Sequence, residues 1–173
     1  GMTFIINGTT PEIRSEIKRV FDDALGVAHR LKRESWILPG GGASHTHLAR
    51  HLRMYATSQS GREQLAIEAY AAALEIIPRV LAENSGIDPI DALLSLSAAQ
   101  NNDPENGSWI GLDAKTGQNI SMEIAGILDP LFVARHALSG ATEAVNSVLR
   151  IDDVLWAKQD AQTPDWQNEI DED

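Results

Sequence analysis

Three consecutive glycines, Gly40, Gly41 and Gly42, stand directly before a helical pattern that begins at Ser44. Glycine has no Cβ, so this run can adopt positive φ angles and let another group approach the backbone closely. A turn of this kind at a helix N-terminus presents unpaired N–H groups and the positive end of the helix dipole, which suits an anion. A triple glycine is also typical of a plain flexible turn, so both interpretations stay open on this pattern alone.

The segment before the glycines carries its own helical pattern. Apolar residues recur at helical spacing over residues 13–31 and predict one long amphipathic helix. Thr9 or Thr10 is expected to cap it, with Pro11 in its first turn. The short apolar run at residues 3–6 predicts a strand ahead of this helix.

Three more helices are expected after the glycines. They cover about residues 44–58, 61–81 and 89–102, and Pro78 should kink or break the second of them. That second helix is apolar almost all round, so we expect it to be buried. The residues expected to point inward from the helix at 44–58 are Leu48, Leu52 and Tyr55.

The C-terminal third combines a hairpin with a last long helix. Residues 108–113 and 119–122 flank a glycine-containing turn and predict a β-hairpin. Asp129 before Pro130 is a common capping arrangement and should start a helix over about residues 131–149. The sequence therefore predicts a mainly α fold with a small β component.

Composition limits the classes of partner. The 173 residues contain no cysteine, which excludes disulfides and thiolate metal sites and fits a reducing cytoplasm. No signal peptide is expected from the opening residues, and no run is apolar enough for a membrane span. The net charge of −11 argues against nucleic acid, because phosphate binding needs clustered Lys and Arg. We therefore expect a cytoplasmic chain with neither nucleic-acid nor membrane partners.

Several short motifs follow one another in a fixed order. They are Asp-Ala-Leu-Gly at 23–26, Pro-Gly-Gly-Gly-Ala at 39–43, Gly-Arg-Glu-Gln-Leu-Ala at 61–66, Asp-Pro-Ile-Asp at 88–91, Gly-Ile-Leu-Asp-Pro at 126–130 and Leu-Arg-Ile-Asp-Asp-Val at 149–154. Over about residues 3–157 the chain resembles the C-terminal part of a group II chaperonin (thermosome) subunit. The resemblance implies a multihelical half of the chaperonin equatorial domain with a small β-hairpin, preceded by a strand and long helix of the intermediate domain.

The resemblance also implies a domain organisation. Residues 1–38 would belong to the intermediate domain and residues 39–157 to the C-terminal half of the equatorial (ATPase) domain, with an edge strand at 151–156. Residues 158–173 are polar and acidic and predict a disordered tail. The family's phosphate loop, magnesium-binding Asp and apical domain have no counterpart in this sequence. It is expected to be either an excised piece or a natural half-length relative.

The same resemblance assigns an ATP site. Asp23 would orient the water that attacks the γ-phosphate, although an Asp at such a position is more often a solvated surface residue. Asp129 would hydrogen-bond the ribose. The other nucleotide contacts that the resemblance implies are Gly40, Gly41 and Gly42, with Asp113 and Ala114 beside the adenine.

A histidine cluster offers a separate hypothesis. His47 and His51 lie at i, i+4 on the expected helix, a spacing that can bind zinc, and His45 is close in sequence. No cysteine and no carboxylate at the matching phase completes such a site. A solvated helix face is the favoured interpretation, and no metal site is assigned.

Two functions follow from these observations. Within a complete subunit the chain would support ATP-driven protein folding with ATP and Mg²⁺, whereas the chain alone is expected to turn over no ATP. In the alternative, it is an assembly or regulatory module that self-associates or binds chaperonin subunits through exposed apolar faces. Unfolded proteins would bind only through the apical domain, which this sequence lacks.

Overall fold

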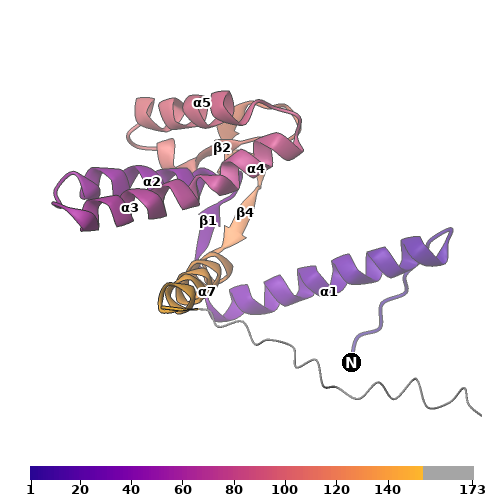
Figure 1. Cartoon of the computed structure of the whole chain (residues 1–173). Helices are drawn as coiled ribbons and strands as arrows, with labels where there is room; N and C mark the ends of the chain where they lie inside the picture. Colours follow the sequence, from indigo (N-terminus) through magenta and orange to yellow (C-terminus); the bar gives the residue numbers. More distant parts are fainter. Residues whose placement is uncertain (154–173) are drawn as a thin grey trace, which may run out of the picture. The chain divides into compact units, whose positions relative to one another are not determined.

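The computed structural model describes residues 1–153, and the part it describes is mainly helical (Figure 1). Within that part, the helices account for most residues and the strands form two antiparallel pairs. Contacts between Cα atoms divide the chain into two compact units that meet between His136 and Ala137. The mainly α fold class predicted from the sequence is confirmed.

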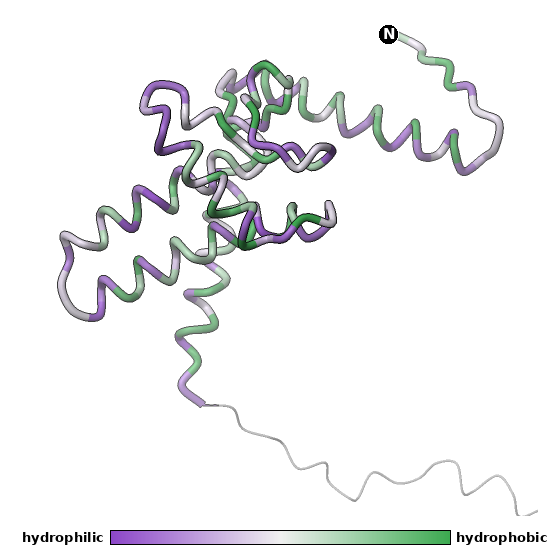
Figure 2. The backbone as a smooth tube through the Cα atoms, turned by 90° about the horizontal axis from the view of Figure 1, so that it is seen from above, coloured by the Kyte–Doolittle hydropathy of each residue, from purple (hydrophilic) through white to green (hydrophobic). Residues whose placement is uncertain are grey.

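The first helix, α1 (Pro11–Arg33), has the cap that the sequence predicts. The Thr10 hydroxyl oxygen accepts a hydrogen bond from the Ile13 N–H at 3.3 Å, which satisfies one of the free donors of the first turn. Apolar and polar residues alternate along the helix (Figure 2), yet none of its residues is buried. The strand expected at residues 3–6 is wrong: this segment has no regular structure, because no described residue offers it a strand edge.

Helices α2 (Ala43–Ala56) and α3 (Arg62–Leu74) lie side by side (Figure 1) and pack through alanines. The expectation that large residues of α2 face inward is wrong, because Leu48 is 43% and Tyr55 56% exposed, and Leu52 is only partly buried. Small side chains let the two helix backbones approach closely, and the large ones are left on the outer faces. The alanines of these two helices with no exposed surface are Ala43, Ala49, Ala56 and Ala71.

The third expected helix is interrupted, as its proline predicts. It consists of α3 and α4 (Ile76–Asn84), with a break at Glu75, three residues before Pro78. Its predicted burial is wrong for this chain: Leu65 is 67% exposed, and Ile76 and Ile77 are about half exposed. Helix α3 packs on α2 and α4 packs mainly on α5, and within residues 1–153 these contacts leave large apolar side chains of both helices exposed.

Helix α5 (Pro89–Asn102) follows an Asp88 cap, whose Oδ1 accepts hydrogen bonds from two backbone N–H groups at 2.9 Å. A 3₁₀ turn, η1 (Gly107–Trp109), leads into β2 (Ile110–Leu112), which pairs antiparallel with β3 (Asn119–Ser121). The predicted hairpin is therefore confirmed. The one-turn helix α6 (Met122–Ala125) comes next.

A second strand pair, which the sequence does not predict, joins distant segments. Strand β1 (Ile37–Pro39) pairs antiparallel with β4 (Leu128–Pro130), so that Asp129 lies opposite Leu38. Helix α7 (Leu131–Leu149) begins directly after β4. Asp129 is thus a strand residue, and its expected role as the cap of α7 is wrong, because the β1–β4 pairing occupies the backbone that would form the cap.

The C-terminal expectations fall mostly beyond this part of the chain. Residues 151–153 form no strand, and the rest of the segment 151–156 and the acidic tail lie outside the described residues. None of the helices in residues 1–153 combines the length and hydropathy that crossing a membrane requires.

Candidate functional site

The three glycines form a sharp turn between β1 and α2. Gly41 and Gly42 have φ angles of +59° and +73°, which L side chains rarely adopt. The Gly40 N–H donates to the Ile127 carbonyl at 3.0 Å, and the Leu112 N–H donates to the Gly41 carbonyl at 2.8 Å. The turn is therefore held between the end of β2 and the approach to β4.

Close packing inside the chain explains why these positions are glycine. A Cβ on Gly41 would lie 2.8 Å from the Leu112 carbonyl oxygen and 2.7 Å from the Met122 sulfur. A Cβ on Gly42 would lie 2.6 Å from the Cβ of Pro78. The glycine run thus has a structural reason of its own, independent of any ligand.

Asp129 stands beside this turn with its carboxylate exposed. Its Oδ2 lies 3.4 Å from the position that a Cβ on Gly40 would occupy, so the carboxylate faces the glycine backbone. Within residues 1–153 it carries no hydrogen bond and is available to a hydroxyl donor. The position of Asp129 just before a helix suggests a helix cap. The β1–β4 pairing instead places its side chain toward the glycines.

Asp113 uses its side chain to shape the hairpin turn. Its Oδ1 accepts from the Lys115 N–H at 3.1 Å and its Oδ2 from the Thr116 hydroxyl at 2.6 Å. The Thr116 hydrogen bond, then that of the Lys115 backbone, lowers the pKa of the Asp113 carboxyl. The Asp113 backbone also bonds within the turn, to Gly117 and Gln118, and Ala114 is exposed at the tip of the turn.

Asp23 is separate from this cluster. It lies exposed on α1, and no described contact links it to the glycine turn. The C-terminal end of α1 is held near the start of α7: Arg135 donates to the Glu34 carboxylate at 2.8 and 2.9 Å, and the Arg30 guanidinium lies 4.7 Å from the centre of the Phe132 ring. The structure thus groups the glycines, the β2 end and Asp129, but not Asp23.

Gln100 supports the site and is not distinguished by sequence. It is 1% exposed, and its Nε2 donates to the Ala43 carbonyl at 3.0 Å and to the Ile110 carbonyl at 2.9 Å. These bonds tie the first turn of α2, directly after the glycines, to the start of β2. Its Oε1 is buried without a hydrogen bond in the described structure. The sequence does not distinguish this buried glutamine from an exposed one, because its burial results from contacts between segments that are distant in the sequence.

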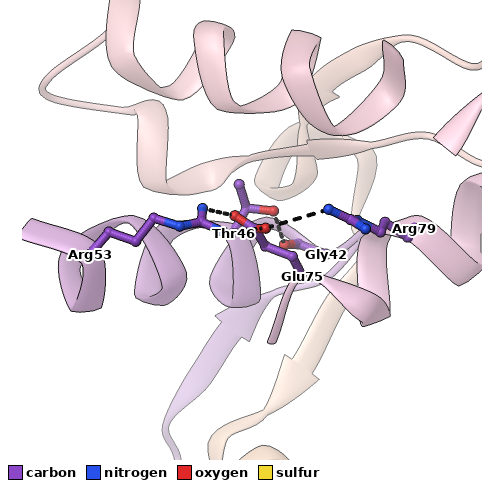
Figure 3. Close-up of polar contacts among 5 residues, drawn as sticks. All are labelled: Gly42, Thr46, Arg53, Glu75 and Arg79. Carbon is purple, nitrogen blue, oxygen red and sulfur yellow. Dashed lines mark hydrogen bonds and ion pairs between the residues drawn. The ribbon is translucent and has the colours of Figure 1, made fainter. Parts of the chain in front are cut away.

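Glu75 supports the other side of the glycine turn. It is 5% exposed and lies between Arg53, which binds both of its oxygens, and Arg79 at 3.9 Å (Figure 3). This ion cluster fixes the break that sets Pro78 against Gly42. The Thr46 hydroxyl also donates to the Gly42 carbonyl at 3.0 Å. An acid within an apolar run, three residues before a proline, was the available sequence signal.

The histidines of α2 are not equivalent. Burial lowers the pKa of His45, against a smaller opposing effect of Asp129, and burial followed by the neighbouring His51 and Arg50 lowers that of His47. The Nε2 atoms of His47 and His51 are 3.0 Å apart. Within the part of the chain that the structure describes, no group of three or more His, Cys, Asp or Glu side chains could hold a metal ion.

These lowered pKa values predict a pH dependence of stability. Below the ordinary His pKa of 6.5, the unfolded chain takes up protons that His45 and His47 exclude when folded. The free energy of unfolding should therefore decrease as the pH falls from about 7 to about 5, above the range in which carboxylates titrate. Urea denaturation across this range measures it. The His45→Gln/His47→Gln double variant should flatten the slope of the unfolding free energy against pH. His29→Gln, at an exposed position, is the control. An unchanged slope in the double variant would show that these two histidines do not cause the pH dependence.

The comparisons with known proteins agree on one family. The model of the TCP-1/cpn60 chaperonin family matches residues 1–159. Thermosome subunit 1 of Haloferax volcanii is 47% identical over 157 residues, covering 90% of this chain and 27% of that protein. The thermosome subunit of Methanocaldococcus jannaschii is 46% identical over 158 residues, covering 91% of this chain and 29% of that protein.

A solved structure extends the agreement to the fold. The open-state monomer of a group II chaperonin from Methanococcoides burtonii superposes with a TM-score of 0.70 at 35% identity, covering 83% of this chain and 35% of that one. The chain spans less than a third of the length of these curated relatives. Identity approaching one half over nine-tenths of the chain shows that it belongs to the TCP-1/cpn60 chaperonin family.

Proposed function

We propose that this chain forms part of an ATP-dependent chaperonin that assists protein folding, and that it supplies the adenosine side of the nucleotide site. The observation that carries the proposal is the glycine turn, which is held against the end of β2 with the free Asp129 carboxylate beside it. An exposed carboxylate that carries no side-chain hydrogen bond in the described residues, beside a turn of backbone, suits a ribose hydroxyl. Family membership and the relatives' thermosome names support the folding role.

The individual residues take roles according to their surroundings. Asp129 accepts from the ribose, the turn formed by Gly40, Gly41 and Gly42 borders the nucleotide through its backbone, and Asp113 with Ala114 lies beside the base. ATP, when bound, supplies the phosphoryl group whose transfer to water drives the chaperonin.

Asp23 is proposed to orient the attacking water in a complete subunit. Its exposure on α1 leaves the carboxylate open to solvent, as a water-orienting group requires. The proposed organisation keeps residues 1–38 in the intermediate domain, 39–157 in the equatorial domain and 158–173 as a tail. A cytoplasmic location, with Mg²⁺ as the partner ion of ATP, belongs to the same proposal.

Nucleotide binding tests this function. The isolated chain should bind ATP, ADP and adenosine alike within a few fold, with dissociation constants in about the millimolar range, because base and ribose contacts alone offer little burial. Amide shifts of Gly40, Gly41 and Gly42 in ¹⁵N spectra report the binding. Asp129→Asn should weaken it, while the change Asp152→Asn at another exposed aspartate should not. Tight, magnesium-dependent preference for ATP, or equal effects of the two variants, contradicts the proposal.

A second candidate is an assembly module, and the exposed apolar side chains favour it. Leu65, Leu94 and Val148 are each exposed over more than half of their surface, which a monomeric soluble domain seldom tolerates in such number. Such a chain should self-associate or bind chaperonin subunits. Light scattering during size-exclusion chromatography tests this second candidate function. A chain that is monomeric at all concentrations contradicts it.

A further inference from the structure

We propose that the exposed side of α3 and α4 binds a second copy of this chain, helix against helix in antiparallel orientation. The proposal rests on the second candidate function, the assembly module, and assigns its partner and its surface. The surface is a stripe of residues separated by alternating steps of four and three positions, all of them exposed. These residues, called the outer stripe below, are Arg62, Ala66, Ala69, Ala73, Ile76, Val80 and Glu83.

The outer stripe is continuous across the break between the two helices. The Glu75 N–H donates to the Ala71 carbonyl and the Arg79 N–H to the Glu75 carbonyl, both at 3.3 Å, so the helical path continues through Glu75. Residues at alternating steps of four and three stay on one side of a helix, which is the spacing of helices that pair along their length. The opposite side of α3 and α4 carries the buried residues Ala71, Leu74, Pro78 and Ala82.

The sizes of the side chains along the outer stripe suit another helix. Its middle consists of exposed alanines, which let a second helix backbone approach closely. Larger apolar side chains lie toward both ends: Leu65, beside the stripe, at one end, and Ile76 with Val80 at the other. Burying these side chains against a second apolar helix would remove them from water.

Charge complementarity identifies the partner as a second copy of this chain. When two stripes run antiparallel with Ala72 of one copy opposite Ala73 of the other, Arg62 lies opposite Glu83. Two-fold symmetry repeats this contact, so the dimer contains it twice. Within residues 1–153 neither Arg62 nor Glu83 forms an ion pair of its own. The same register pairs apolar residues with each other, Leu65 with Val80 and Ala69 with Ile76.

Sedimentation velocity of the full chain over a wide range of concentration tests the association, and a reversible monomer–dimer equilibrium is expected. Ala73→Glu should weaken the dimer by about a hundredfold or more, because it buries two unpaired carboxylates near the two-fold axis. Ala98→Glu is the matched control. It adds the same charge at an exposed alanine of α5, outside the stripe, and should leave the dimer unchanged. Circular dichroism shows whether each variant keeps its helices.

Charge reversal tests the identity of the partner and the register. Arg62→Glu and Glu83→Arg should each weaken the dimer several-fold, because each places like charges opposite one another. The double variant Arg62→Glu/Glu83→Arg restores both pairs and should recover the native affinity. Each change puts a favourable charge at a helix end, an acid at the start of α3 or a base at the end of α4, so the monomer should keep its helices.

Spin labels test the antiparallel orientation. The chain contains no cysteine, so Glu63→Cys, at an exposed position, allows one label per copy. In the proposed register Glu63 lies opposite Ala82 of the second copy. The two labels should therefore be about 30 Å apart in the dimer, whereas a parallel pair would place them about 10 Å apart. Pulsed electron resonance measures this distance.

The outcomes separate this surface from the assembly function on which it rests. A dimer that Ala73→Glu leaves intact overturns the surface but leaves the assembly module standing. A chain that is monomeric at all concentrations contradicts both, and another occupant, such as α7 or a different protein, then covers the stripe. Failure of the double charge reversal to recover the affinity, or a short distance between the labels, also overturns the proposal.

Discussion

Gly42→Ala is expected to lower the free energy of unfolding by about 2–5 kcal/mol, a large share of the stability of a domain this size. Two effects add. An alanine at φ +73° is strained by about 1–2 kcal/mol. Its Cβ would also lie 2.6 Å from the Cβ of Pro78, an overlap that costs about 1–3 kcal/mol more as the α3–α4 break is pushed away.

Gly86→Ala is the matched control for this change. Gly86 has the same φ of +73°, but a Cβ there meets nothing within 4 Å. It should show only the strain, about 1–2 kcal/mol, so the difference between the variants isolates the packing against Pro78. Urea denaturation measures both. Equal losses at the two positions would show that Pro78 does not press on the glycine turn.

Gln100→Glu is the second change with a large expected effect. The carboxylate has the shape of the amide but cannot donate to the Ala43 and Ile110 carbonyls, and it places a charge at a position that is 1% exposed. An uncompensated buried charge and two lost hydrogen bonds should lower the free energy of unfolding by about 3–5 kcal/mol at pH 7. Chemical denaturation at neutral pH tests this directly.

The loss caused by Gln100→Glu should have a pH signature. Burial raises the pKa of the introduced carboxyl group, and its protonated form regains one donor, so part of the stability returns as the pH falls below about 6. The native chain, in contrast, is expected to lose stability as the pH falls over this range. Asn101→Asp adds the same charge one residue further on, where the side chain is exposed and paired with Arg50, and should change stability by less than about 1 kcal/mol. Similar losses at both positions would contradict the role of Gln100.

The helices were predictable because their ends are encoded locally. Thr10 and Asp88 cap α1 and α5 with their own side chains. Pro78 has no backbone N–H to donate within a helix, and the break between α3 and α4 lies three residues before it. The β2–β3 hairpin was predictable for the same reason, because its turn is built within a few residues around Asp113. Each signal acts over distances that a short window of sequence contains.

Burial was not predictable, because it depends on which surfaces meet. Hydrophobicity selected Leu48 and Tyr55 as core residues, whereas the α2–α3 contact buries alanines. The apolar run of α3 and α4 indicated a buried helix, yet nothing in the described part of this chain covers its outer face. A sequence specifies an apolar face, and the neighbouring element decides whether that face is covered.

The sequence by itself determined the family, the order of the helices and the glycine turn, since these depend on local conformational preferences and on motifs read in order. Only the tertiary structure decided where the Asp129 carboxylate lies. Strands β1 and β4 are short and far apart in the sequence. Because they pair, Asp129 is a strand residue and not a helix cap, and its carboxylate lies beside Gly40. Strand pairing between distant segments is set by the packing of the whole fold, which no local pattern encodes.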